Sequence, residues 1–176
     1  MITLVYGGSA CGKSQFAEDT ICRLSEGKNK YYIATMQVGD DEENIERVEK
    51  HRRMRAEKGF TTIECQCNLE KALDAMGDSK NALLECVSNL VANEMFFGGE
   101  IIGKEETVTK VKSGIDKLIS EIKNLVIVTN NVFESDSDYD ETTLSYMDAL
   151  GEINAYLSGL ADEVYEVVVG IPLRIK

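Results

Sequence analysis

Residues 2–14 read Ile-Thr-Leu-Val-Tyr-Gly-Gly-Ser-Ala-Cys-Gly-Lys-Ser, and this stretch decides the fold. The apolar run 2–6 predicts a buried strand, and the spacing of apolar residues from Lys13 to Leu24 predicts a helix. Residues 7–14, which join this strand to the start of the helix, match the phosphate-loop pattern G-x-x-x-x-G-K-[ST] in the strand-to-helix position that the pattern requires. The predicted nucleotide-binding residues of this loop are Gly7, Gly8, Ser9, Ala10, Cys11, Gly12, Lys13 and Ser14.

The chemistry of the loop follows from its residue types. Glycines let the backbone fold around phosphates so that N–H groups point inward, and the following helix adds the positive end of its dipole. We expect Lys13 to reach the β- and γ-phosphates and the Ser14 hydroxyl to bind Mg²⁺. The alternative is a glycine-rich turn that binds no ligand.

The remainder of the chain alternates short apolar runs with longer amphipathic ones. This alternation predicts an α/β fold with a mostly parallel sheet and helices on both faces. Strands are predicted at 30–35, 60–65, 82–86, 125–129, 163–169 and 171–175, and helices at 41–58, 68–76, 88–97, 105–123 and 139–160.

Composition limits the possible classes of protein. A chain of 176 residues that is 43% hydrophobic is expected to form one domain, residues 1–176. Its 19 basic and 31 acidic residues give a formal net charge of −12, which argues against a nucleic-acid partner. Five cysteines without a dense disulfide pattern favour a reducing cytoplasm. The sequence contains neither an export signal nor a run long enough to span a membrane, so we expect no membrane partner.

A second acidic contact for a nucleotide-bound Mg²⁺ is expected at the end of a neighbouring strand. Glu85 ends the apolar run Ala82-Leu83-Leu84, so its carboxylate would emerge at the carboxyl edge of the sheet beside the loop. Glu85 and Ser14 are therefore the predicted metal ligands. A structural role for Glu85 at the strand end is the alternative.

A basic segment interrupts the acidic chain at residues 47–55. If it is helical, Arg47, His51 and Arg55 share one face at spacing i, i+4, i+8. Cations along that face would attract phosphate and keep His51 neutral, which suits it as a nucleophile toward phosphorus. The alternative is a solvated helix whose basic residues pair with the acidic residues one turn before them. Both interpretations stay open on the residues alone.

Cysteine spacing suggests two further sites, neither of which we favour. Cys65 and Cys67 resemble part of a metal site, but structural zinc needs four ligands and the other candidates are scattered. Cys11 lies in the phosphate loop, where a helix terminus lowers the pKa of a thiol, yet the sequence assigns it no catalytic task.

Beyond the loop, several segments together resemble the family of bifunctional adenosylcobinamide kinase/adenosylcobinamide-phosphate guanylyltransferases. The resemblance covers the whole chain, and the loop combined with the histidine segment and the carboxyl terminus makes it specific. It is carried by Val5–Ser14, Tyr32–Thr35, Asp41–Glu43, Arg47–Arg55, Thr62–Glu64, Leu83–Cys86 with Asn93, Val128–Asn130, Gly151 with Asn154, and Val168–Lys176.

The resemblance implies two reactions at one nucleotide site. ATP or GTP would phosphorylate the aminopropanol hydroxyl of adenosylcobinamide, and GMP from GTP would then pass through a guanylylated histidine, matched by His51, to give adenosylcobinamide-GDP. It also implies a RecA-like P-loop fold and a homotrimer with sites near subunit boundaries. The further nucleotide-contacting positions that it implies are Ala34, Thr35, Met36, Arg52, Arg53, Met54, Arg55, Glu64 and Glu85.

One segment departs from the family pattern. Residues 130–141 are acidic where the family has a Glu, a glycine-rich loop and then several arginines, and Ala155 replaces the usual Gln after Asn154. Three hypotheses follow: an enzyme with both activities, a kinase that has lost guanylyl transfer, and a nucleotide-binding regulatory or scaffold subunit without chemistry. Joint retention of Lys13, Ser14, Glu85 and His51 argues against the third.

Overall fold

The structure, a computed structural model, describes residues 1–37, 53, 55–78, 80–96, 98–99, 101–133 and 139–176. Its strands are β1 (Ile2–Tyr6), β2 (Lys30–Ala34), β3 (Phe60–Glu64), β4 (Asn81–Glu85), β5 (Asn124–Val128), β6 (Glu163–Val168) and β7 (Ile171–Arg174). Its helices are α1 (Lys13–Leu24), α3 (Lys71–Asp74), α4 (Val87–Phe96), α5 (Lys104–Glu121) and α6 (Glu141–Leu160).

The strands form one seven-stranded sheet in the order β3-β2-β4-β5-β1-β6-β7. All neighbouring strands run parallel except β6 and β7, which form an antiparallel hairpin at one edge. The expected mostly parallel α/β sheet is confirmed. Because the parallel strands share one direction, the ends of β1, β2, β4 and β5 meet at a single carboxyl edge, which is where such sheets bind ligands.

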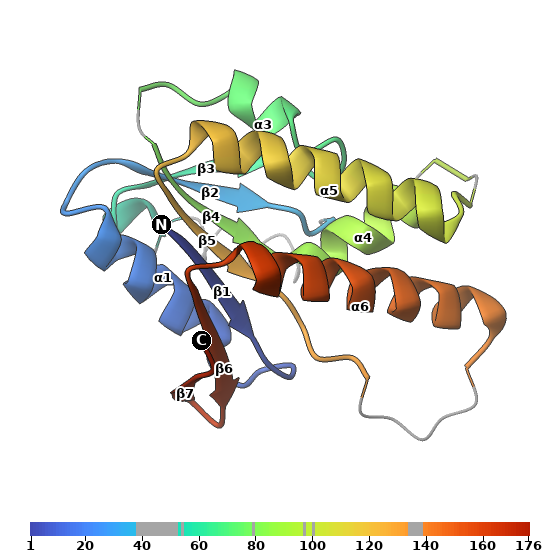
Figure 1. Ribbon diagram of the computed structural model, residues 1–176. Coiled ribbons are helices and arrows are strands. Elements are labelled where there is room, and N and C mark those ends of the chain that lie inside the picture. The colour runs from blue at the N-terminus through green and yellow to red at the C-terminus, as the bar shows by residue number, and fades with distance from the viewer. Residues whose placement is uncertain (38–52, 54, 79, 97, 100, 134–138) are drawn as a thin grey trace.

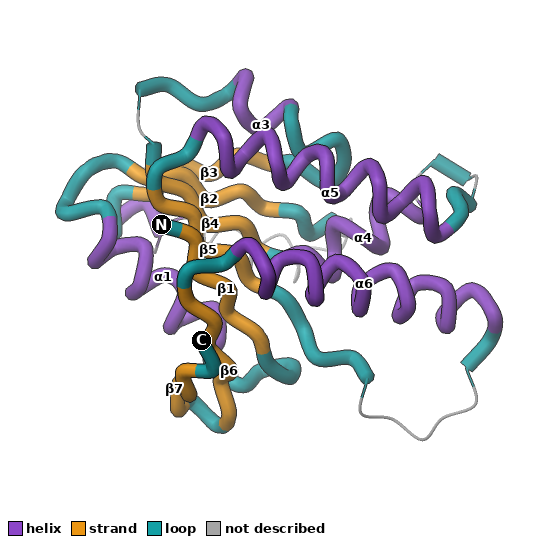
Figure 2. The backbone as a smooth tube through the Cα atoms, viewed as in Figure 1, coloured by secondary structure: helices purple, strands orange, loops and turns teal. Residues whose placement is uncertain are grey.

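Helices cover both faces of the sheet (Figures 1 and 2). In β1, Leu4 packs in the core beneath α4, α5 and α6, whereas the next residue, Val5, packs against α1 on the opposite face. Ile33 and Tyr32 of β2 divide between the two faces in the same way. This alternation follows from the two-residue period of a strand, and it explains why strands buried on both sides appear as continuous apolar runs.

Most of the predicted elements are present, with ends shifted by one or two residues, and one prediction was wrong. The helix expected at 68–76 is only the short α3, and Asn68 does not cap it. Asn68 has φ +53° and donates its backbone N–H to Glu94, while Glu70 occupies the cap position. The predicted helix 41–58 lies mainly outside the described residues, although residues 55–57 are helical and Gly59 follows with φ +77°.

Within the described part of the chain, no helix combines the length and apolarity that crossing a membrane requires.

Candidate functional site

The phosphate loop occupies the turn between β1 and α1. A side chain at Gly7 would place its Cβ 2.7 Å from the Val167 carbonyl oxygen and 2.8 Å from Cys11 Sγ, so only glycine fits. Ala10 and Gly12 have φ of +55° and +94°, and such left-handed residues curl a loop into a concave cradle of N–H groups. The local sequence thus builds an anion-binding shape.

Two backbone hydrogen bonds hold this loop in place. Asn131, after β5, donates its N–H to the Gly7 carbonyl at 2.9 Å. Gly170, in the turn between β6 and β7, donates its N–H to the Cys11 carbonyl at 2.8 Å. The carboxyl-terminal hairpin therefore braces the loop from one side, and the segment after β5 braces it from the other.

Lys13 lies at the first position of α1 and is buried, with 7% of its surface exposed. Its Nζ donates to the Gly8 carbonyl at 2.7 Å, which holds the ammonium group over its own loop. A lysine in this position presents its charge to any anion that enters the cradle.

Ser14 and Glu85 meet across the carboxyl edge. The Ser14 hydroxyl donates to Glu85 Oε1, and Glu85 Oε2 is buried without a hydrogen-bond partner among the described residues. Burial raises the pKa of Glu85, while the Ser14 and Tyr32 hydroxyls oppose that rise. Glu85 therefore lies where the sequence placed it, at the end of β4 beside the loop.

A hydroxyl and a carboxylate with an unpaired oxygen are the donors that Mg²⁺ prefers, so these two residues fit the expected ion. Nucleotide-bound Mg²⁺ needs few protein ligands because phosphate oxygens and water complete its shell. Among the described residues no group of three or more His, Cys, Asp and Glu side chains could hold a metal. That includes Cys65 and Cys67, of which Cys65 instead directs its thiol to the Cys67 and Asn68 carbonyls.

A cavity of about 350 Å³ opens beside the loop. Besides the loop, three charged side chains reach it: Glu18 from α1, Arg55 from the end of the basic segment, and Lys58 from the turn that follows. Lys58 Nζ pairs with Glu18 at 2.5 Å, and this contact raises the pKa of Lys58. With Lys13, the cavity therefore gathers three cations and one carboxylate in a chain of net charge −12. Its lining residues are Ala10, Cys11, Gly12, Lys13, Ser14, Gln15, Glu18, Arg55 and Lys58.

The structure brings only part of the predicted basic segment to this cavity. Arg55 is 9% exposed and lies flat on Tyr32, its guanidinium carbon 3.7 Å from the ring centroid. Arg53 is exposed to solvent. His51, Arg52 and Met54 lie outside the described residues.

The remaining predicted nucleotide contacts lie along the carboxyl edge at different distances from the loop. Ala34 and Glu64 are paired in register at the ends of β2 and β3, and β3 is separated from β1 by three strands. At ~4.8 Å per strand, Glu64 lies roughly 19 Å from the loop strand, outside the cavity described above. Met36 is 41% exposed at the same edge.

Thr35 has a different environment from its neighbours. It is fully buried, its hydroxyl donates to the Cys86 carbonyl at 2.8 Å, and the same oxygen accepts the Cys86 N–H at 2.7 Å. Asn93 then donates to the Thr35 carbonyl at 2.7 Å. The Thr35 side chain thus holds the chain just after Glu85, which is a supporting role for the site.

Sequence reasoning missed Glu18, Lys58 and Tyr32. Glu18 lies four residues after Ser14 and hence on the same helix face, a signal that was available. Lys58 lies one turn after the basic run and continues it. Tyr32 gave no signal, because its contacts depend on how β2 packs against β4 and the basic segment.

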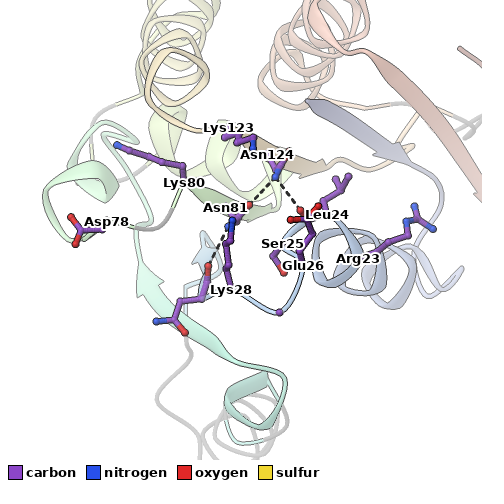
Figure 3. A pocket seen from close by; sticks show the side chains of 12 residues that line it. Arg23, Leu24, Ser25, Glu26, Lys28, Asp78, Lys80, Asn81, Lys123 and Asn124 are labelled. Atoms are coloured by element: carbon purple, nitrogen blue, oxygen red, sulfur yellow. Dashed lines mark hydrogen bonds between the residues drawn. The ribbon is translucent and has the colours of Figure 1, made fainter.

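A larger hollow, about 810 Å³, lies at the opposite, amino edge of the sheet. Two of its lining residues are asparagines whose side-chain amides are already engaged in hydrogen bonds. Asn124 Nδ2 donates to Asn81 Oδ1 at 2.8 Å, and Asn81 Nδ2 donates to the Asn29 carbonyl at 3.4 Å. Figure 3 shows Arg23 and Lys80 extending in opposite directions, and Lys80 pairs with Glu121 at 3.6 Å. Although this hollow is larger, its charged groups do not converge on a common point.

A family model and two curated proteins match nearly the whole chain. A family model described as "Cobinamide kinase / cobinamide phosphate guanyltransferase" matches residues 3–175. The "Bifunctional adenosylcobalamin biosynthesis protein CobU" of Escherichia coli (strain K12) is 32% identical over 186 residues, covering 100% of both chains. The protein of the same name from Salmonella typhimurium is also 32% identical over 186 residues, with 100% of each chain covered.

Two solved structures share the fold at low sequence identity. The KaiC-like protein PH0186 from Pyrococcus horikoshii OT3 has a TM-score of 0.54 at 12% identity, covering 94% of this chain and 71% of that one. The second, the structure of an ATPase domain, has a TM-score of 0.52 at 13% identity, covering 94% of this chain and 68% of that one. The expected RecA-like P-loop fold is therefore confirmed.

Proposed function

We propose that this chain, which belongs to the cobinamide kinase/cobinamide phosphate guanyltransferase family, catalyses two steps of cobalamin assembly at one nucleotide site. It phosphorylates adenosylcobinamide with ATP or GTP, and it transfers GMP from GTP to the resulting phosphate. The observation that carries the proposal is that Lys13, Ser14 and Glu85 meet at the carboxyl edge, where the second Glu85 oxygen is buried without a hydrogen-bond partner among the described residues.

In the first step, the aminopropanol oxygen attacks the γ-phosphorus of the triphosphate. The bond from that phosphorus to the β,γ-bridging oxygen breaks, the nucleoside diphosphate leaves, and the hydroxyl proton is released to solvent. The loop N–H groups and Lys13 would orient the phosphates and neutralise the charge that builds on them. Arg55 and Lys58 add positive charge at the cavity rim.

In the second step, a nitrogen of neutral His51 attacks the α-phosphorus of GTP, and pyrophosphate leaves. The phosphate of the phosphorylated acceptor then attacks the same phosphorus, the P–N bond breaks, and the histidine is regenerated with GMP on the acceptor. Splitting one difficult transfer into two easier ones is the benefit of a covalent intermediate. His51 lies outside the described residues, but Arg55 of the same segment and Lys58, which follows it, reach the cavity.

Ser14 and Glu85 would hold Mg²⁺, which supplies charge neutralisation at the phosphate oxygens when it is bound. The nucleotide contacts that we propose beyond the loop are Ala34, Met36, Arg52, Arg53, Met54, Arg55 and Glu64. Thr35, which is fully buried, would support these contacts through its hydrogen bonds to Cys86.

The test compares GTP labelled at the α-phosphate with GTP labelled at the γ-phosphate. Incubation with α-labelled GTP should leave acid-labile, alkali-stable label on the protein, whereas γ-labelled GTP should leave none. His51→Asn should lose the label yet still phosphorylate adenosylcobinamide, and Lys13→Ala should lose both activities. Asparagine at position 51 is the matched control for shape and polarity, because it keeps a hydrogen-bonding side chain without a nucleophilic imidazole.

The outcomes distinguish an enzyme with both activities from a kinase alone and from a nucleotide-binding subunit without chemistry. Label from α-labelled GTP that persists in His51→Asn would assign the nucleophile elsewhere. If the wild-type chain acquires no label and does not turn over adenosylcobinamide, nucleotide binding without chemistry is the hypothesis that remains.

A kinase without guanylyl transfer is the second candidate, and the acidic segment 130–141 is the observation that favours it. The acidic side chains of this segment would repel a second anionic substrate, the phosphorylated acceptor. This candidate predicts turnover of adenosylcobinamide with γ-phosphate alone and no product containing GMP.

We further propose a homotrimer in the cytoplasm. The family resemblance implies the trimer, and the β6–β7 hairpin supports an interface because Val169, Ile171 and Ile175 are 82%, 58% and 64% exposed at the sheet edge. An unprotected apolar edge strand can pair with another chain, and large exposed apolar patches mark interaction sites. Light scattering should give the mass of three chains, and Ile171→Lys should reduce it. All five cysteines are free thiols, as in a reducing compartment.

A further inference from the structure

Tyr32 lies between two parts of the proposed site that are far apart in the sequence. In β2 it pairs with Leu83 of β4, and Glu85 is two residues further along β4. Side chains in such diagonal positions share a face of the sheet, and an aromatic ring is long enough to reach across. Tyr32 is 7% exposed, so its contacts are made in the interior.

One face of the Tyr32 ring carries Arg55. The guanidinium carbon lies 3.7 Å from the ring centroid, and Phe60 packs against the same ring edge-on, with centroids 6.0 Å apart and planes at 88°. A guanidinium stacked on a ring has its plane fixed, so the directions of its N–H groups are fixed as well. Because Arg55 also lines the loop cavity, Tyr32 fixes how the basic segment presents a cation there.

The strand register places Glu85 on the same face of the sheet as Tyr32 and diagonally across from it, within reach of the Tyr32 hydroxyl. Burial is the main reason that the pKa of Tyr32 is raised, and the Glu85 carboxylate adds to it. The ring and the hydroxyl therefore act on different partners, which separate substitutions can distinguish.

We propose that Tyr32 is a positioning residue of the nucleotide site: its ring orients Arg55 toward the loop cavity, and its hydroxyl steadies the Glu85 carboxylate beside Ser14. The inference rests on the proposed function, because it assumes that the cavity binds a nucleoside triphosphate. Tyr32 itself acts through Arg55 and Glu85, and its role is distinct from that of a core tyrosine that only fills space.

The ring is tested by a double-mutant cycle on the full chain, with binding of fluorescent N-methylanthraniloyl-GTP in the presence of Mg²⁺ as the readout. Arg55→Lys keeps the charge but removes the flat guanidinium, and Tyr32→Leu removes the ring. A desolvated cation–π contact corresponds to about five- to thirtyfold in affinity, so each single variant should bind that much more weakly. If the ring acts through Arg55, the double variant should bind no more weakly than either single one.

Phe60→Leu is the matched control, since it removes a neighbouring ring from the same part of the core without touching Arg55. It should lower the unfolding temperature as Tyr32→Leu does, but leave the affinity for the nucleotide within about twofold. Equal losses of affinity in Tyr32→Leu and Phe60→Leu would overturn the proposal. So would a double variant, Tyr32→Leu with Arg55→Lys, whose loss of affinity equals the two single losses multiplied together. If Tyr32→Leu does not fold, the affinity of Arg55→Lys for the nucleotide serves as the test, because a wild-type affinity in that variant would also overturn the proposal.

The hydroxyl is tested by Tyr32→Phe, which keeps the stacked ring. Affinity for the nucleotide at saturating Mg²⁺ should stay within about twofold, whereas the Mg²⁺ concentration for half-maximal binding should rise about fivefold, the effect of losing one polar neighbour of the carboxylate. An unchanged Mg²⁺ requirement would contradict the claim that the Tyr32 hydroxyl steadies the Glu85 carboxylate. A wild-type chain that binds neither ATP nor GTP would instead defeat the proposed function, so the two failures are distinguishable.

Discussion

The amino ends of α1 and α6 solve the same electrostatic problem in different ways. Each helix begins with N–H groups that lack an intrahelical partner and with the positive end of its dipole. At α6 the chain supplies the anion itself, because Asp140 accepts the Thr143 N–H at 2.7 Å and Glu141 occupies the first turn. At α1 the cap is Gly12, no side chain caps the helix, and the first turn contains no acidic residue.

The amino end of α6 is therefore capped by acidic side chains of the chain itself, whereas the amino end of α1 has no such cap and leaves its N–H groups open to an anion. An acidic cap at α1 would compete with a phosphate for the same N–H groups. α5 agrees with this distinction: it also lacks a side-chain cap, but Glu105 and Glu106 lie in its first turn. The uncapped end of α1, together with Lys13 and the Ser14–Glu85 pair, therefore supports the proposed nucleotide site at the carboxyl edge, although the hollow at the amino edge is larger.

The largest expected effect is at the α1 end. Lys13→Ala should weaken GTP binding by roughly 10²–10³-fold, because a charged donor aimed at the phosphates is removed from a buried position. Isothermal titration calorimetry measures the affinity, and Lys80→Ala at the amino-edge hollow is the control, expected to bind within about twofold of wild type. A comparable loss in Lys80→Ala would show that the larger hollow belongs to the nucleotide site.

Short-range patterns account for what the sequence could predict. The loop, its strand and its helix are contiguous, so motif and periodicity coincide at residues 2–24 and the structure confirms them. Glu85 was placed correctly because an acidic residue after a buried apolar run has to emerge at the strand end. The wrong start at Asn68 has a tertiary cause, since Glu94 takes up its N–H from a different helix.

Long-range contacts account for what could not be predicted. The ion pair of Glu18 with Lys58 joins residues 40 positions apart, and the stack of Arg55 on Tyr32 joins β2 to the basic segment. Neither contact has a periodicity or a motif, because each arises only when two separately formed elements pack together. Cavity residues on a second element are thus the ones that sequence reasoning misses.

An intermediate effect is expected from the ion pair beside α1. Lys58 shares the cavity with the loop, so Lys58→Ala should weaken GTP binding by up to about fivefold, the upper value of a partly exposed pair. Glu18→Gln should act in the opposite direction and tighten binding, because it removes a negative charge that faces the phosphates. Lys112→Ala, which breaks the 2.8 Å pair of Lys112 with Glu152 on α6, is the control and should change affinity for GTP in neither direction.

The smallest effect is expected at the α6 end, on stability alone. The Thr143 backbone N–H holds the pKa of Asp140 below its ordinary value of 3.8, so the contribution of its charge to stability is present above that pH and is lost as pH falls through the lowered pKa. At pH 7, thermal unfolding should give wild type the highest midpoint, Asp140→Asn a lower one, and Asp140→Ala the lowest by a few degrees. As the pH falls below 3.8, the midpoint of wild type should approach that of Asp140→Asn, because both then carry an uncharged acceptor at the cap. All three proteins should bind GTP equally at neutral pH; a loss of affinity in Asp140→Ala would mean that the two helix ends are coupled and that α6 is part of the nucleotide site.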